Sequence, residues 1–110
     1  MDQNDGPTNN GCSNCRGIVT LNDATGEVTK NEEYYALAHF SKFVRPGAHR
    51  ITIKAEETEQ LFHVAFLNQD GSRIFVAANN KPTSLLLDIR EGRHQYKITI
   101  PAKAVITVAW

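Results

Sequence analysis

Apolar and polar residues alternate with period two through much of the second half of the chain. Ile51 and Ile53 alternate with polar neighbours, as do Tyr96, Ile98 and Ile100. Such alternation is typical of strands with one buried face. Further strand-like stretches, separated by turn-forming residues, cover residues 61–67, 73–78, 85–89 and 105–109. Six short strands with this spacing predict an antiparallel β-sandwich or barrel.

The stretch 61–67 differs from the others because it is nearly continuous apolar sequence, interrupted by His63. Such a run predicts a strand that is covered on both faces. We expect His63 to be a hydrogen-bonded core or interface residue. The turn formers at 68–72 predict a hairpin between this strand and 73–78.

The first part of the chain, residues 1–47, is poorer in β-branched side chains and opens on a stretch of turn formers at 2–11. We expect a loop there. Two short β-prone pieces, 16–21 and 27–30, flank the sequence Asn-Asp-Ala-Thr-Gly at 22–26. This arrangement predicts a small hairpin.

A helix is predicted over residues 32–44. Asn31 followed by Glu32 and Glu33 is a favourable helix start, because the amide accepts from an orphan N–H and the carboxylates favour the positive end of the macrodipole. Pro46 ends it. The apolar side chains spread over about 220°, whereas a surface helix needs a stripe only somewhat wider than about 100°. We therefore expect this helix to lie between two partners, the alternative being burial in its own domain.

The charge balance limits the classes of partner. The 110 residues include 12 Lys and Arg against 12 Asp and Glu. Zero net charge argues against a protein that coats nucleic acid, since such proteins carry a basic surface. No apolar run approaches the roughly 20 residues that a membrane-spanning helix needs. Length and composition fit one domain with its own core.

The most distinctive short motif is Cys12-Ser13-Asn14-Cys15. One CxxC does not supply the four ligands of a structural zinc site. Nor does it open a helix after a strand, as a redox-active pair is expected to do. We expect a local disulfide or paired thiols that pin a loop, with free cysteines and metal or redox chemistry as the alternatives. Our prediction for the chain is that it holds no metal and no cofactor.

Catalytic groups are hard to find in the sequence. None of the four histidines has a nucleophile and an acidic partner at the spacing of a hydrolytic triad. Glu32 and Glu33 are explained by the helix start, and the acidic cluster at 56–59 by a solvated turn. Retaining glycosidases need two carboxyl groups about 5 Å apart. The sequence shows no such pair.

Aromatic side chains in the β-rich part are a candidate sugar-binding platform, because an apolar ring face packs on the C–H face of a sugar. Most of them stand in apolar strands, so we expect them to pack in the core instead. These residues are Phe62, Phe66, Phe75, Tyr96 and Trp110.

Several longer segments follow one another in a recognisable order. The most specific is His-Phe-Ser-Lys-Phe at 39–43, followed by Pro-Gly-Ala-His-Arg-Ile at 46–51. Arg-Gly-Ile-Val-Thr at 16–20 precedes them, and Val-Ala-Phe at 64–66 and Thr-Ile-Pro at 99–101 follow. Over essentially the whole chain, these segments resemble the C-terminal part of glycoside hydrolase family 30, which includes lysosomal glucocerebrosidase and bacterial β-glucanases and xylanases.

The resemblance implies a division of the chain. In that family a (β/α)8 barrel carries the catalytic glutamates and a β-sandwich packs beside it. Residues 1–47 would be the end of the barrel, with a loop, a small hairpin and the helix, and residues 48–110 the C-terminal sandwich. The implied fold class is mainly β: an antiparallel β-sandwich with one N-terminal helix, the remnant of the last βα unit of the barrel. Such a helix would face the barrel on one side and the sandwich on the other.

No catalytic residue carries over from the resemblance. The acid/base and nucleophile glutamates of the family come from the fourth and seventh barrel strands, and no Glu here matches either motif. Asp2, Gln3 and Asn4 would follow the eighth strand, on the face where barrel active sites lie. They are therefore candidate substrate-binding residues. Asp5 stands where the family commonly has a second glycine.

Three functions follow as hypotheses. The first is the non-catalytic C-terminal segment of a secreted or periplasmic retaining β-glycosidase, glucosylceramidase-like or β-glucanase-like. Its partners would be a β-linked carbohydrate substrate and the catalytic barrel of the same parent chain. The second is a free-standing carbohydrate-binding module, and the third is an interaction domain that docks onto another chain. We also expect the isolated segment to form a homodimer through its exposed helix face.

Overall fold

The computed structural model describes residues 1–4, 6–7, 10–13, 15–54 and 61–110. The chain divides into two compact units, Met1–Ala38 and His39–Trp110. The boundary falls within the helix, which therefore contributes residues to both units. No helix in the described part is long and apolar enough to cross a membrane. The elements are β1 (Val19–Leu21), β2 (Val28–Lys30), α1 (Glu32–Ser41), β3 (His49–Ile51), β4 (Leu61–Leu67), β5 (Arg73–Asn79), β6 (Leu85–Glu91), β7 (His94–Ile100) and β8 (Ala104–Ala109).

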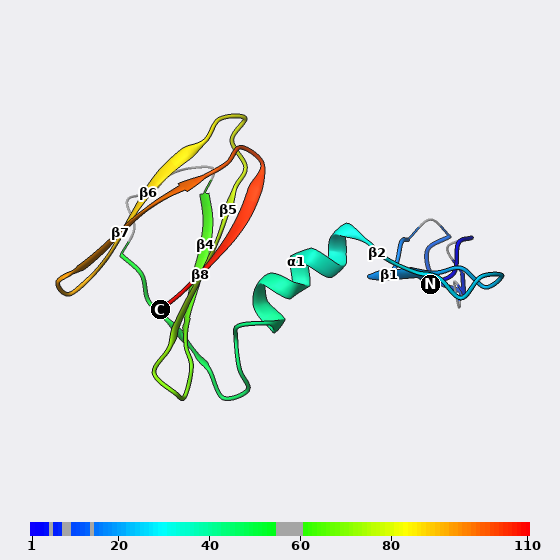
Figure 1. The fold of residues 1–110 in the computed structure, drawn as a ribbon, viewed down its shortest axis with the longest axis horizontal. Coiled ribbons are helices and arrows are strands. Elements are labelled where there is room, and N and C mark those ends of the chain that lie inside the picture. The colour runs from blue at the N-terminus through cyan, green and yellow to red at the C-terminus, as the bar shows by residue number, and fades with distance from the viewer. Residues whose placement is uncertain (5, 8–9, 14, 55–60) are drawn as a thin grey trace. The chain divides into compact units, whose positions relative to one another are not determined.

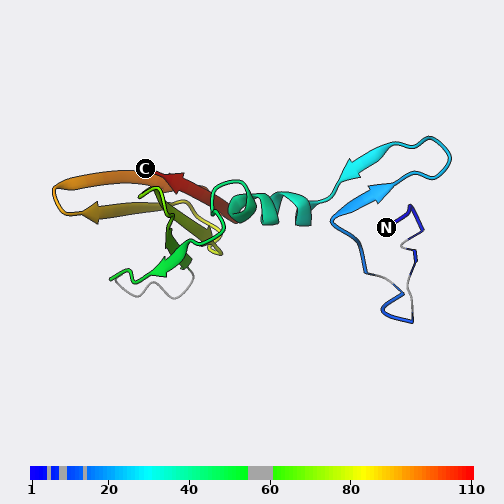
Figure 2. The ribbon, with the colours of Figure 1, turned by 90° about the horizontal axis from the view of Figure 1, so that it is seen from below.

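The first unit contains the predicted hairpin, which the structure confirms. Strands β1 and β2 are antiparallel, with Leu21 opposite Val28, and Figure 2 shows the turn that joins them. The turn is closed by two backbone bonds, from the Asn22 N–H to the Glu27 oxygen at 2.8 Å and from the Gly26 N–H to the Asn22 oxygen at 2.7 Å. Gly26 has a φ of 73°, which glycine adopts without steric cost.

Helix α1 starts as predicted but ends at Ser41, so the predicted end at Val44 is wrong. The N–H groups of Phe43 and Val44 both bond to the Phe40 oxygen, at 3.1 and 2.8 Å. Beyond the helix, the side-chain amide of Asn68, 25 residues farther along the chain, donates to the Phe43 oxygen at 3.0 Å. A long-range contact thus holds the segment that follows the helix.

The side chains of α1 stay accessible, and none is fully buried. Tyr35 is 58% exposed and Leu37 is 51% exposed. Within the first unit, Tyr35 and Leu37 are therefore not buried, and the two partners of the helix stay a prediction.

The second unit contains the six predicted strands, arranged in two antiparallel sheets (Figure 1). The larger sheet has the order β3-β4-β5-β8, and β6 and β7 form a two-stranded ladder. Phe62 of β4 pairs with Ala78 of β5, which pairs with Val105 of β8. Partners in register point to the same face.

The core lies between the two sheets, which makes the second unit a β-sandwich. The buried cluster is Ala65, Phe75 and Ala77 from the larger sheet with Ile100 from β7. The predicted fold class, mainly antiparallel β with one helix, is thereby confirmed in its architecture. Partly buried apolar side chains surround this cluster: Ile51, Ile53, Leu61, Leu87, Ile89, Ala104, Ile106, Val108 and Trp110.

The prediction that β4 is covered on both faces is correct only for its second half. Val64 to Leu67 are buried or partly buried, whereas Phe62 and His63 are exposed. The ring of His63 stacks on that of Phe75 with centroids 6.1 Å apart.

Candidate functional site

The carboxylate of Asp2, the first candidate substrate-binding residue, organises its own loop. Oδ1 accepts the N–H of Gly6 at 2.7 Å and that of Asn4 at 2.9 Å. These bonds, that of Gly6 first, hold the pKa of the Asp2 carboxyl below its usual value. A Cβ at Gly6 would lie 3.0 Å from Asp2 Oδ2, so glycine allows the close approach.

The loop that carries Asp2 lies against the β1–β2 hairpin. Gln3 Oε1 accepts the N–H of Asp23 at 3.1 Å, and the Leu21 N–H donates to the Met1 oxygen at 2.8 Å. Gln3 and Asn4 are exposed. The structure thus brings the candidate substrate-binding residues together in one loop, and their contact with a substrate stays a prediction. Asp5 lies outside the described residues.

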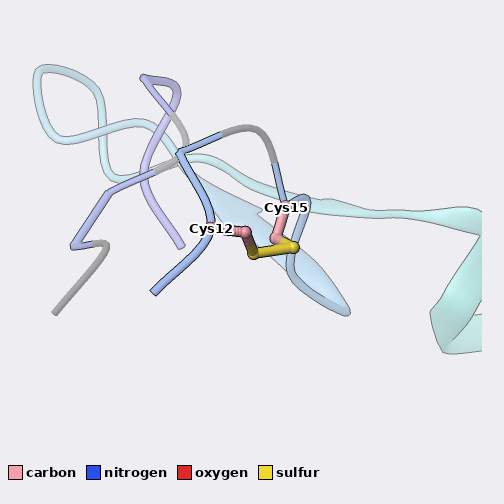
Figure 3. The surroundings of a disulfide bond; sticks show 2 residues. All are labelled: Cys12 and Cys15. Carbon is pink, nitrogen blue, oxygen red and sulfur yellow. A yellow bond between two sulfur atoms is a disulfide. The ribbon is translucent and has the colours of Figure 1, made fainter. Parts of the chain in front are cut away.

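Cys12 and Cys15 are joined in a disulfide (Figure 3). Their Cα atoms are 5.5 Å apart, within the usual range for a bridged pair. The bond closes a short loop between the N-terminal residues and β1.

Glu32 and Glu33 share one cation in the first unit. Arg16 Nη2 lies 3.2 Å from Glu32 Oε2 and 3.1 Å from Glu33 Oε1. The pKa of the Glu33 carboxyl is lowered, first by its own backbone N–H and then by Arg16. A general acid needs a raised pKa, so this convergence is an ion pair at the helix start. The acidic cluster at 56–59 lies outside the described residues.

Surface carboxylates of the sandwich also stabilise turns and strands. The Ser72 hydroxyl and N–H donate to Asp70 Oδ1 at 2.6 and 2.9 Å, which lowers the pKa of the Asp70 carboxyl. Asp88 accepts from Arg90 and Gln95, at 2.8 Å for the nearest atoms of each. Within the part of the chain that the structure describes, no three His, Cys, Asp or Glu side chains are placed to hold a metal ion.

His39 connects the end of α1 to the larger sheet. Its Nδ1 lies 2.9 Å from Thr107 Oγ1, and the Thr107 hydroxyl donates to the His39 oxygen at 3.1 Å. Because the hydroxyl has a single proton, Nδ1 must carry the proton of the other bond. Phe40 packs edge-on against Phe66 of the same sheet face, with centroids 6.3 Å apart.

A hollow of about 250 Å³ opens farther along this face, beyond the part that His39 and Phe40 contact. Phe62, Ala78 and Val105 line it in register across three strands. Phe62 is 65% exposed and Val105 is 42% exposed, so the prediction that Phe62 packs in the core is wrong. Sequence reasoning missed the hollow because it depends on strand register, for which the local sequence holds no signal.

Comparisons with known proteins agree with this architecture. The sequence profile described as "Glycosyl hydrolase family 30 beta sandwich domain" matches residues 47–108, more than half of the chain. The endo-1,6-beta-D-glucanase neg1 of Aspergillus fumigatus is 41% identical over 110 residues, covering 94% of this chain and 22% of its own length. The lysosomal acid glucosylceramidase of Mus musculus is 33% identical over 82 residues, covering 74% of this chain and 16% of its own.

The solved structure of the endo-beta1,6-glucanase BT3312 superposes on the whole chain with a TM-score of 0.89 and 32% sequence identity. The match covers 25% of that enzyme. The chain thus spans about a fifth of the length of the relatives that it matches. By its sequence profile, its relatives and its fold, the chain belongs to glycoside hydrolase family 30 and contains the β-sandwich domain of that family.

Proposed function

We propose that this chain is the non-catalytic C-terminal part of a retaining β-glycosidase that acts on a β-linked glucan or glucoside. The observation that carries the proposal is the family match itself, which falls on the sandwich at 47–108. Relatives in which the same segment forms about a fifth of the length are glucanases and glucosylceramidases by name. The remaining length of such a protein would hold the catalytic barrel.

The chemistry of the described carboxylates supports a non-catalytic role. Hydrolysis with retention of the sugar's anomeric configuration requires a carboxylate nucleophile and a carboxylic general acid about 5–5.5 Å apart. The general acid needs a raised pKa. Glu32 and Glu33 converge, but they do so on the guanidinium of Arg16. That cation and the backbone lower the pKa of Glu33, so Glu33 is ionised at neutral pH and cannot protonate a leaving group.

The proposed role of the segment is to support the barrel. Tyr35 and Leu37 expose large apolar surfaces on α1, which suits a helix whose other neighbour is the barrel. The loop with Asp2, Gln3 and Asn4 would then reach the substrate side of the barrel. The Cys12–Cys15 disulfide fits an oxidising compartment, and it supports secretion or export to a periplasm as the localisation.

A hydrolysis assay of the purified chain tests the proposal. We expect no release of aryl aglycone from aryl β-glucosides and no reducing ends from β-1,6-glucan. Turnover that follows the chain through every purification step, and disappears when the chain is removed, would overturn the non-catalytic role.

The same apolar helix surface supports self-association of the isolated chain as a homodimer. Light scattering should give twice the monomer mass, and Leu37→Lys should return the monomer, because a lysine ammonium is costly to bury in an apolar contact. A monomer at high concentration in the unsubstituted chain would contradict this part of the proposal.

A further inference from the structure

We propose that the hollow at Phe62, Ala78 and Val105 is a secondary carbohydrate site that binds one ring of a β-linked glucan, separate from catalysis. The choice of a glucan rests on the proposed function above. The geometry of the site rests on side chains of the larger sheet and of the turns that follow β5 and precede β8.

The floor and walls of the hollow follow from strand register. Ala78 stands between Phe62 and Val105 on neighbouring strands, and its side chain is a single methyl group. The larger side chains on either side rise above it, and Phe62 leaves 65% of its surface accessible. An accessible aromatic ring beside a depression is the apolar surface on which the C–H face of a sugar packs.

Polar groups stand at one end of the hollow. Lys103 Nζ donates to the backbone oxygen of Asn80 at 2.6 Å and to its Oδ1 at 3.0 Å. An ammonium has three protons, so a further one is available to a ligand hydroxyl. Lys103 adopts a φ of 53°, a left-handed conformation that is unfavourable for a residue with a Cβ. Residues other than glycine that adopt this backbone conformation are found more often at functional sites.

The size and the lining of the hollow favour a small ligand with hydroxyl groups over a protein. The residues that line it include amides and one cation, and none of them is a carboxylate. Farther along the same sheet face, His39 contacts Thr107 of β8 and Phe40 packs on Phe66 of β4. That part of the face is therefore covered by the chain itself. Two exposed apolar side chains cannot supply the roughly 800 Å² per partner of a standard protein interface. An aromatic surface with a few convergent polar groups is typical of a small-ligand site.

Affinity electrophoresis in gels that contain soluble β-1,6-glucan tests this site, with isothermal calorimetry on β-1,6-linked oligosaccharides as the second measurement. We expect the chain to be retarded and Phe62→Ala to weaken binding roughly tenfold through lost apolar contact. Leu86→Ala is the matched control, because Leu86 is an equally exposed apolar side chain, at 68%, on β6. It should bind as the unsubstituted chain does.

Lys103→Gly separates binding from folding. Glycine removes the backbone strain of the left-handed conformation and also removes the ammonium group. The melting temperature of the variant should therefore stay the same or rise, while its affinity for the glucan falls. An unretarded unsubstituted chain, equal losses in Phe62→Ala and Leu86→Ala, or full affinity in Lys103→Gly would overturn the site.

The outcome also distinguishes this site from the proposed function. Aryl β-glucoside hydrolysis by a barrel-bearing protein does not involve the hollow. If that activity is present and glucan retardation is absent, only the secondary site is wrong. If Phe62→Ala instead loosens the fit between the sandwich and a barrel, the hollow is an interdomain contact and the carbohydrate site is likewise refuted.

Discussion

Replacing Asn79 removes the amide that ties three strand ends of the sandwich together. Asn79 is the last residue of β5 and is 2% exposed. Its Nδ2 donates to the carbonyl oxygens of Thr83, Ile100 and Pro101 at 2.9, 3.2 and 3.0 Å. Its Oδ1 accepts the N–H of Lys81 at 3.0 Å. The amide therefore fixes the end of β5 to the segment before β6 and to the end of β7.

The expected loss follows from counting these bonds. The amide has two protons for three carbonyl groups, so it makes two full donated bonds and one accepted bond. At about 1 kcal/mol each, Asn79→Ala should lower the free energy of unfolding by about 3 kcal/mol. In a domain of this size that is a fall in Tm of roughly 12–24 °C.

Asn79→Asp makes the same position sensitive to pH. The carboxylate would face carbonyl oxygens in a buried site, so its pKa in the folded state should be raised above the unfolded value of about 3.9. Ionisation then favours the unfolded chain, and the penalty grows as the pH rises from about 4 through the raised pKa. Below about pH 4 the penalty is absent, because the acid is neutral in both states. At pH 7 the aspartate variant should be less stable than the alanine variant, and near pH 3.5 more stable.

Calorimetric melts of both variants at the two pH values measure this directly. Asn80→Asp is the control, because Asn80 is the exposed neighbour and faces the Lys103 ammonium. It should change the stability by no more than about 0.5 kcal/mol. A fall in Tm of under about 3 °C in Asn79→Ala, or an aspartate-to-alanine difference that does not vary with pH, would show that the Asn79 amide does not hold these strand ends together.

Three further predictions concern other contacts. Because the pKa of the Asp70 carboxyl is lowered in the folded state, the ionised carboxylate stabilises the fold above about pH 4, and this stabilisation is lost as the pH falls through the folded pKa. In a series of Tm measurements against pH, Asp70→Asn should therefore reduce the fall in Tm on the acid side. An equal fall in the variant and the unsubstituted chain would contradict this prediction. The Cys12–Cys15 disulfide lies in the first compact unit, so its reduction should speed trypsin cleavage after Arg16 and shift the Tm of the sandwich by under about 2 °C. Loss of the unfolding transition of the sandwich would contradict this prediction. Thr107→Val removes both bonds to His39 and should lower the stability by about 1–2 kcal/mol; an unchanged denaturant midpoint would contradict it.

The strands could be predicted from the sequence because their signal is local. Period-two alternation and the turn formers between the runs do not depend on distant residues, and five of the six strands of the second unit occur close to where these patterns place them. The sixth, β3, is His49–Ile51, so it ends before Ile53 of the predicted alternation. The helix end could not be predicted in this way. Asn68 has the pattern of an ordinary turn residue, yet its side chain binds the Phe43 carbonyl and the Arg45 N–H and so holds the segment after the helix.

The candidate sites show the same limit. Asn79 stands in a run of turn formers at 79–83, and only the approach of β7 makes its amide a buried connection. Phe62 stands in an apolar run and reads as a core residue. Register places it opposite Ala78, on the face away from the core. A single sequence contains the residues of such sites but not the pairing that brings them together.

The proposed function gives the chain a supporting role in a glycosidase and no hydrolysis of its own. A chimera tests this role: the matching segment of the Aspergillus fumigatus endo-1,6-beta-D-glucanase, 41% identical to this chain, is replaced by the 110 residues. The release of reducing ends from β-1,6-glucan is then measured for the chimera, for the glucanase that lacks the segment and for the chain alone. We expect activity in the chimera, much less in the glucanase that lacks the segment and none in the chain alone. Hydrolysis by the chain alone, or a chimera no more active than the glucanase that lacks the segment, would rule out the supporting, non-catalytic role.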